Sequence, residues 1–145
     1  MTLRVAINGF GRIGRNVMRG WLSRGADTGI EIVGMNSTSD PKTSAHLLTY
    51  DSILGKLDPS VQIETTDETM IVNGKEIKFF ADRNPLNCPW KDWGVDLVLE
   101  STGVFNTDEK ASLHLEAGAS QVILTAPGKG PGVGTFVVGV NDHDY

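Results

Sequence analysis

The sequence has little cysteine, no run of basic residues and no long apolar stretch. Its one cysteine, Cys88, excludes an internal disulfide and a zinc site built from several cysteines. No apolar stretch approaches the roughly 20 residues that a membrane span needs, and the opening MTLRVAINGF lacks the pattern of a secretory signal. The net charge of −5, without a basic cluster, argues against binding nucleic acid or a membrane surface through bulk charge. These absences favour a cytoplasmic protein.

What the sequence does contain is the composition of one ordinary globular domain. The chain has 145 residues, of which 39% are hydrophobic and 21% charged. This length fits a single domain, and the composition is typical of soluble proteins. No repeat, low-complexity tract or linker divides it, so we treat residues 1–145 as one domain.

Strand patterns alternate with helix patterns along most of the chain. Strands are expected over residues 4–8, 31–35, 95–100, 121–125 and 135–140, and helices over residues 12–24, 41–51 and 107–117. Asp40 is expected to cap the second helix and Pro41 to begin it. Residues 61–81 have the pattern of short antiparallel strands, with Asn73-Gly74 as a hairpin turn. The order predicts an α/β fold, a doubly wound and mostly parallel Rossmann sheet with a small inserted antiparallel hairpin.

The segment Gly9-Phe10-Gly11-Arg12-Ile13-Gly14 matches the pattern G-x-G-x-x-G, and it lies between the first strand and the first helix. In this context Gly9 allows a sharp turn, Gly11 lets a pyrophosphate approach the backbone, and Gly14 lets helix and strand pack closely. The N-terminus of the helix offers free N–H groups and partial positive charge to phosphates. The pattern predicts a dinucleotide site. A glycine-rich turn without a ligand is the alternative.

The tip of the second strand, Gly34-Met35-Asn36-Ser37-Thr38, lacks the acidic residue that normally binds the ribose 2′-hydroxyl. Ser37 and Thr38 are neutral and would not repel a 2′-phosphate, so NADP as well as NAD is an expected cofactor. Asp40 is better explained as the cap of the next helix. Ser37 alternatively caps a turn, as serine often does.

Five segments of the chain, in order, resemble the glyceraldehyde-3-phosphate dehydrogenase family, and the resemblance covers the whole length. They are RVAINGFGRIGR (residues 4–15), AHLLTYDSILG (45–55), NGKEIKFFADRNP (73–85), ESTGVF (100–105) and LTAPGKG (124–130). The stretches DRNPLNCPW and TAPGKG are most similar to the photosynthetic branch of cyanobacteria and plastids. Members of that branch use NADPH, and often NADH.

The resemblance also implies roles for residues around the cofactor. Arg12 and Ile13 would line the pyrophosphate, Arg83 would cover the adenine side, and Ser37 stands where the family usually has aspartate. Ser101, Thr102 and Gly103 would lie beside the phosphates and the nicotinamide ribose, and Thr125 on the nicotinamide side. With the glycine motif, the expected cofactor site comprises Asn8, Gly9, Phe10, Gly11, Arg12, Ile13, Gly14, Asn36, Ser37, Thr38, Arg83, Ser101, Thr102, Gly103 and Thr125.

The family's activity is hydride transfer between the nicotinamide cofactor and glyceraldehyde 3-phosphate or 1,3-bisphosphoglycerate, in glycolysis or the Calvin cycle. Its nucleophilic cysteine lies in a segment like SCTTNC, beyond a motif that resembles Gly139–Asn141, and no such segment occurs up to Tyr145. Cys88 lies far from that place in the sequence. The three histidines, His46, His114 and His143, are interpreted as solvated or half-buried structural residues. We expect no catalytic residue, no metal and no substrate domain in this chain, and no activity of the chain alone.

The resemblance implies as partners the remainder of the dehydrogenase in a homotetramer, phosphoribulokinase, and a small redox regulatory protein of the Calvin cycle. Two other functions stay open. One is a stand-alone, non-catalytic nucleotide-binding or interaction module. The other is erythrose-4-phosphate dehydrogenase, which this half of the sequence distinguishes poorly.

Overall fold

The computed structural model describes residues 2–25 and 28–145, and its elements follow the predicted alternation. The strands are β1 (Leu3–Asn8), β2 (Ile30–Asn36), β3 (Tyr50–Asp51), β4 (Gly55–Lys56), β5 (Ile63–Thr65), β6 (Thr69–Val72), β7 (Lys75–Phe80), β8 (Leu97–Glu100) and β9 (Gln121–Leu124). The α-helices are α1 (Arg12–Arg24), α2 (Pro41–Thr49) and α3 (Asp108–Glu116), and 3₁₀ turns cover Pro85–Asn87 and Asp142–Asp144.

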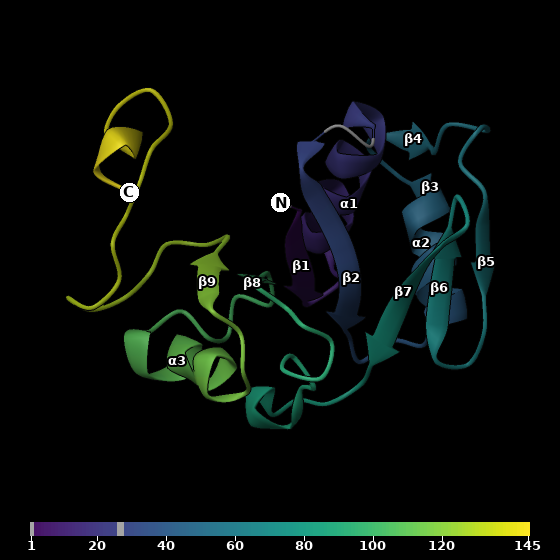
Figure 1. The fold of residues 1–145 in the computed structure, drawn as a ribbon. Helices are drawn as coiled ribbons and strands as arrows, with labels where there is room; N and C mark the ends of the chain where they lie inside the picture. The colour runs from purple at the N-terminus through teal and green to yellow at the C-terminus, as the bar shows by residue number, and fades with distance from the viewer. Residues whose placement is uncertain (1, 26–27) are drawn as a thin grey trace.

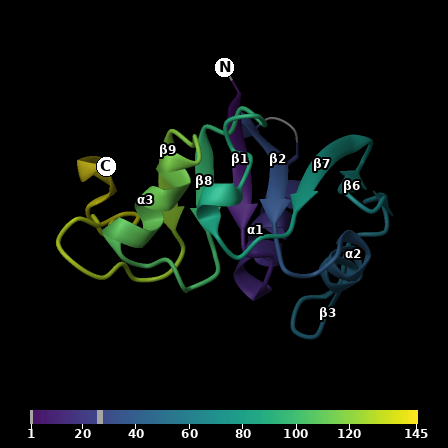
Figure 2. The same cartoon turned by 90° about the horizontal axis from the view of Figure 1, so that it is seen from below.

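Seven strands form one sheet in the order β5-β6-β7-β2-β1-β8-β9 (Figure 1). The strands β7, β2, β1, β8 and β9 pair in parallel, whereas β5, β6 and β7 pair antiparallel. The arrowheads of β1, β2, β7 and β8 therefore lie side by side at one edge (Figure 2). This confirms the predicted Rossmann-type sheet. The inserted hairpin extends that sheet, and β3 and β4 form a separate pair that we did not predict.

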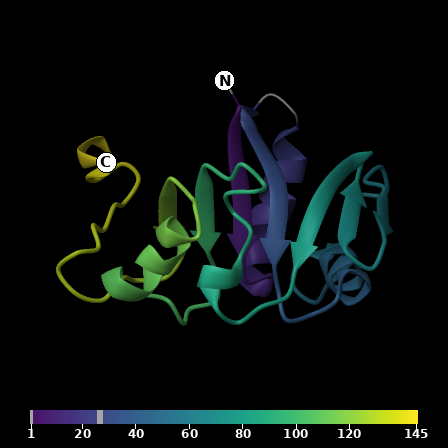
Figure 3. The same cartoon turned by 60° about the horizontal axis from the view of Figure 1, so that its bottom comes forward.

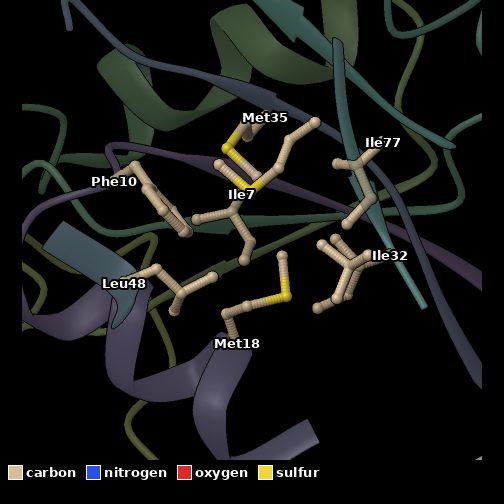
Figure 4. Packing of buried hydrophobic residues seen from close by; sticks show 9 residues of the cluster. Ile7, Phe10, Met18, Ile32, Met35, Leu48 and Ile77 are labelled. Carbon is tan, nitrogen blue, oxygen red and sulfur yellow. The ribbon is translucent and has the colours of Figure 1, made fainter. Parts of the chain in front are cut away.

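Helices cover both faces of the sheet, as Figure 3 shows with α3 in green before it and α1 in purple behind it. On the face of α1 and α2, Met18 and Leu48 point toward Ile7 and Ile32 (Figure 4). On the opposite face, the segment around Trp90 packs on the central strands. Because both faces of the central strands are buried, these strands have nearly continuous apolar sequences.

The predicted turns and caps have the expected geometry. Asn73 and Gly74 have φ values of 50° and 78°, so both adopt the left-handed conformation that a type I′ hairpin turn requires. The Asp40 side chain accepts a hydrogen bond from the backbone N–H of Thr43, and Pro41 begins α2. Thr107, expected as the first residue of a helix, instead caps α3, because its side chain accepts a hydrogen bond from the Lys110 N–H.

One predicted helix ends two residues earlier than expected, and one predicted strand is absent. The helix from Pro41 ends at Thr49, because Tyr50 and Asp51 pair with Gly55 and Lys56 instead. Residues 135–140 form no strand. They run beside no strand of the sheet, and Val138 is 90% exposed. Their apolar, β-branched composition suits a strand, but strand propensity depends on a pairing partner and on burial, and this segment has neither.

Candidate functional site

The carboxyl ends of β1 and β8 define the switch point of the sheet. After β1 the chain continues to β2 on one side, and after the antiparallel strands it returns to β8 on the other side of β1. In open α/β sheets, ligands bind in the crevice outside the strand ends at such a point. Here the Gly9 turn and the Ser101–Gly103 loop leave adjacent strands, and the Ser101 N–H donates to the Asn8 carbonyl at 2.7 Å.

The three glycines of the motif differ in why the position requires glycine. Gly9 has a φ of +93°, and a Cβ there would lie 2.7 Å from the methyl group of Thr102. A Cβ on Gly14 would clash with the Gly9 carbonyl oxygen. Both glycines are therefore required by the fold. Gly11 has an ordinary φ of −77°, and nothing lies within 4 Å of its hypothetical Cβ. The chain itself does not explain this glycine, whereas a ligand approaching the backbone would.

The N-terminus of α1 differs from those of the other two helices. The side chains of Asp40 and Thr107 occupy N–H groups of α2 and α3, and α3 also has Asp108 and Glu109 in its first turn. The helix α1 has no side-chain cap and no acidic residue in its first turn. Its free N–H groups and its partial positive charge therefore face the space beside Gly11, where they can bind an anion.

The side chains between the glycines point in different directions. Phe10 is buried in the core with Met18, so it anchors the turn and presents only its backbone to the crevice. Ile13 is 47% exposed. The Arg12 guanidinium lies 3.0 Å from the Asp51 carboxylate of β3. The backbone N–H groups of Leu54 and Ile53, with Arg12, lower the pKa of Asp51 to about 2.

The tip of β2 lies against the loop that contains Arg83. The Asn36 side-chain amide donates to the Asp82 carbonyl at 2.8 Å and accepts from the Asp82 N–H at 3.0 Å. The fold thus brings Arg83 beside the strand tip, although 46 residues separate Asn36 from Asp82. Ser37 accepts a long hydrogen bond, 3.3 Å, from the N–H of Ser39, which agrees with the turn-capping alternative. The nearby Thr38 is exposed.

The loop after β8 is tied to the end of that strand. Thr102 donates both its N–H and its hydroxyl to the Glu100 carboxylate. Gly103 has a φ of +75°, and a Cβ at this position would meet no atom within 4 Å. The Thr125 N–H and hydroxyl both lie 3.1 Å from the Glu100 carbonyl, which places Thr125 at the same edge.

Sequence reasoning missed Glu100 and misjudged His114. Both are fully buried, and the His114 Nε2 atom lies 2.8 Å from Glu100 Oε2. His114 is therefore neither solvated nor half-buried, contrary to our interpretation. The sequence could have indicated this pair, because a glutamate ends the apolar strand VDLVLE and an acidic residue is rarely buried without a partner.

The sequence profile of the family "Glyceraldehyde 3-phosphate dehydrogenase, NAD binding domain" matches residues 3–108. The chain belongs to this family. The protein named glyceraldehyde-3-phosphate dehydrogenase 2 of Synechocystis sp. is 61% identical over 142 residues, which cover 98% of this chain and 41% of that protein.

Two chloroplastic relatives extend the comparison to photosynthetic eukaryotes. The chloroplastic glyceraldehyde-3-phosphate dehydrogenase of Chondrus crispus is 56% identical over 145 residues, 100% of this chain and 34% of that protein. Chloroplastic glyceraldehyde-3-phosphate dehydrogenase A of Zea mays is 50% identical over 143 residues, 99% of this chain and 35% of that protein. The chain therefore spans well under half the length of these relatives.

Two further features of the chain are the buried Cys88 and a cavity beside α1. Cys88 is buried, and burial, with the charges of Asp82 and Glu100, raises its pKa to about 12. Burial and the raised pKa both disfavour the thiolate, which is the nucleophilic form of cysteine. A cavity of about 580 Å³ lies between α1 and residues 54–61, away from the glycine turn. Over residues 2–25 and 28–145, no cluster of His, Cys, Asp and Glu fits a metal, and no helix is long and apolar enough to cross a membrane.

Proposed function

We propose that this chain binds NAD or NADP at the carboxyl edge of the sheet, as the cofactor-binding part of a phosphorylating glyceraldehyde-3-phosphate dehydrogenase. The observation that carries the proposal is the pairing of Gly11 with the uncapped N-terminus of α1 at the switch point. A Cβ at Gly11 would project into open space that a pyrophosphate would fill, and free N–H groups are the donors that phosphates require.

The residues around this point fit the parts of a dinucleotide. The backbone of Gly9, Gly11 and Ile13 would hold the pyrophosphate, with Asn8, Phe10, Arg12 and Gly14 shaping the turn. Asn36, Ser37, Thr38 and Arg83 would hold the adenosine, while Ser101, Thr102, Gly103 and Thr125 would hold the nicotinamide side. When bound, the nicotinamide exchanges a hydride with the substrate. This chain would bind the cofactor and orient it toward glyceraldehyde 3-phosphate or 1,3-bisphosphoglycerate.

The strand tip supports the use of both cofactors. No carboxylate follows Asn36 directly, and the nearby Asp82 carboxylate accepts hydrogen bonds from Asn84 and Asn87 within its own loop. A 2′-phosphate beside Ser37 would therefore meet a hydroxyl, and the Arg83 loop is close to the strand tip. We propose that NADP is tolerated and that NAD is still bound.

A matched pair of variants tests cofactor binding. Gly11→Trp places a large side chain in the space proposed for the pyrophosphate, and we expect it to weaken the binding of NAD and NADP at least about a hundredfold, a loss of ~2.7 kcal/mol. Gly20→Trp is the control, because Gly20 lies within α1 and, as at Gly11, a Cβ there would meet nothing within 4 Å. Calorimetric titration of the full-length protein would read the two dissociation constants. Equal Kd values for both variants would contradict the proposal.

We propose that residues 1–145 bind the cofactor but do not oxidise the aldehyde by themselves. The support is chemical: the buried Cys88 thiol is not an available nucleophile. The test is reduction of NAD or NADP by glyceraldehyde 3-phosphate with purified residues 1–145. Turnover above that of Gly11→Trp would overturn this statement.

The proposed partners are the remainder of the dehydrogenase in a homotetramer, together with phosphoribulokinase and a small redox regulatory protein. The similarity to a Synechocystis and to chloroplastic dehydrogenases supports them. We propose a cytoplasmic location, and the support is that the sequence has a single cysteine and so forms no internal disulfide. Size-exclusion chromatography of the full-length protein with phosphoribulokinase, and fractionation of the cell, would test these two proposals.

A further inference from the structure

Four buried polar side chains form a continuous hydrogen-bonded path beneath the proposed cofactor edge. The Asn36 amide donates to Asn8 Oδ1 at 2.7 Å, and the Asn8 amide donates to Glu100 Oε2 at 2.5 Å. His114 Nε2 lies 2.8 Å from the same Glu100 oxygen. All four residues are at most 6% exposed. The path links β2, β1, β8 and α3, and the proposed cofactor loops leave the first three of these elements.

The indole of Trp90 determines the protonation of His114. Trp90 Nε1 lies 3.0 Å from His114 Nδ1, and an indole N–H can only donate. His114 Nδ1 must therefore be the unprotonated acceptor, so the single ring proton is on Nε2 and donates to Glu100. The imidazole is neutral, and Glu100 carries the charge.

Hydrogen bonds rather than a basic side chain hold that charge in the core. Burial by itself raises the pKa of Glu100, but the hydrogen bonds from His114, Thr102 and Asn8 outweigh it and lower the pKa below its usual value. Over the described part of the chain, no Lys or Arg forms an ion pair with this carboxylate. Glu100 is thus an ionised group satisfied by neutral donors.

The same carboxylate connects both sides of the switch point. One oxygen accepts from Thr102, whose methyl group packs so closely on Gly9 that a Cβ there would lie 2.7 Å away. The other oxygen accepts from Asn8, the residue directly before Gly9. A change at Glu100 would therefore move the glycine turn and the Ser101–Gly103 loop together.

We propose that Glu100 is a positioning residue for dinucleotide binding, which sets the glycine turn and the Ser101–Gly103 loop relative to each other from beneath, with His114 as its neutral donor. This inference rests on the proposed cofactor function. A dinucleotide that spans both loops would bind tightly only when the two loops keep this spacing. Loops that are already ordered lose little conformational entropy on binding.

Glu100→Gln in the full-length protein tests the role directly. The side chain keeps its size, but its amide donors now face the donors of Thr102 or of Asn8 and His114, so we expect the Kd for NAD and NADP to rise about tenfold or more. Glu31→Gln is the control for loss of a charge, because Glu31 is an exposed residue of β2. Ile77→Val is the control for loss of stability, because Ile77 is buried in β7, away from the network. Both controls should keep the wild-type Kd.

A second pair of variants covers the case in which Glu100→Gln does not fold. His114 lies on α3 and not on any of the proposed cofactor loops, and its Nε2 atom reaches those loops from beneath, 2.8 Å from Glu100 Oε2 and 3.4 Å from Asn8 Nδ2. His114→Gln keeps a donor near the position of Nε2, and its Kd should stay within about twofold of wild type, whereas His114→Leu removes the donor and should raise the Kd about threefold or more. Equal Kd values for folded His114→Leu and His114→Gln would overturn the proposal.

Nuclear magnetic resonance of ¹⁵N-labelled protein gives a readout that needs no cofactor. His114 should show one protonated nitrogen, Nε2, and one unprotonated nitrogen, Nδ1, and a doubly protonated ring would overturn the assignment. If wild type binds neither NAD nor NADP, the proposed function fails and the positioning role fails with it. If wild type binds and folded Glu100→Gln binds equally well, only the positioning role fails.

Discussion

The two halves of the sheet share an apolar core, but they differ in the polar side chains that they bury. Met70, Val72 and Ile77 of the antiparallel half are apolar, and they belong to a core cluster that continues into Ile7, Ile32 and Met35 of the parallel half. In the parallel half, the strand ends bury Asn8, Asn36 and Glu100 together with His114 of α3. Burying a polar group is unfavourable unless it is hydrogen-bonded, and here the network meets that need. We therefore expect substitutions in the antiparallel half to change stability alone, and substitutions at the ends of the parallel strands to change the binding of the proposed cofactor.

The largest expected effect is on stability alone. Ile77→Ala removes buried methyl and methylene groups from the antiparallel half and should lower the free energy of unfolding by about 2–5 kcal/mol. The Kd for NAD and NADP, measured below the melting temperature, should not change, because Ile77 is in β7 and not at the carboxyl edge. Chemical denaturation and calorimetric titration would check the two values. A changed Kd would contradict the separation of the two halves.

Gly14→Ala should lower both the stability of the fold and the affinity for the cofactor. The new Cβ would clash with the Gly9 carbonyl oxygen, so α1 must move away from β1. Forced shifts of packed backbone typically cost about 1–3 kcal/mol. The same movement would displace the N-terminus of α1, and the Kd should rise as well. Gly20→Ala, on the same helix in open space, is the matched control and should lower neither stability nor affinity.

Ser37→Asp should change affinity without a comparable change in stability. The new carboxylate would accept a hydrogen bond from a ribose 2′-hydroxyl and repel a 2′-phosphate, so the ratio of NADP to NAD affinity should fall at least about tenfold, which corresponds to ~1.4 kcal/mol. Titration of both cofactors against the full-length protein would measure it. An unchanged ratio would mean that the ribose is held elsewhere.

The smallest expected effect concerns Asp51, whose carboxylate pairs with Arg12 of the glycine motif. Because the folded-state pKa is lowered to about 2, the ionised Asp51 stabilises the fold above its ordinary pKa of about 4, and this contribution is lost as the pH falls from 4 toward 2. Asp51→Asn keeps an acceptor oxygen for Ile53 and Leu54 but loses the attraction to Arg12. Its melting temperature should be slightly lower than wild type at pH 7, and the difference should shrink toward pH 2. A difference that does not depend on pH would contradict an electrostatic cause.

Local sequence was sufficient to predict the structure wherever backbone conformation or hydrophobic periodicity determines it. The glycine turn, the Asp40 cap, the Asn73-Gly74 hairpin and the alternation of strands and helices follow from short patterns, since steric limits and hydrogen-bonding groups act over a few residues. The family resemblance was readable for the same reason, because its motifs are short and ordered. Residues 135–140 show the limit, because their strand-like composition is not matched by a partner strand.

Tertiary structure decided the features that depend on residues far apart in the sequence. The contact of Asn36 with Asp82 spans 46 residues, and the Asn8–Glu100 hydrogen bond spans 92. Nothing in the local pattern around His114 shows that it is buried between Trp90 and Glu100, or that the Trp90 indole N–H donates to its Nδ1 atom. The sequence by itself determined that a dinucleotide turn opens the first helix. Only the packed sheet determined which buried groups hold that turn, because burial and hydrogen-bond partners are set by the strand order.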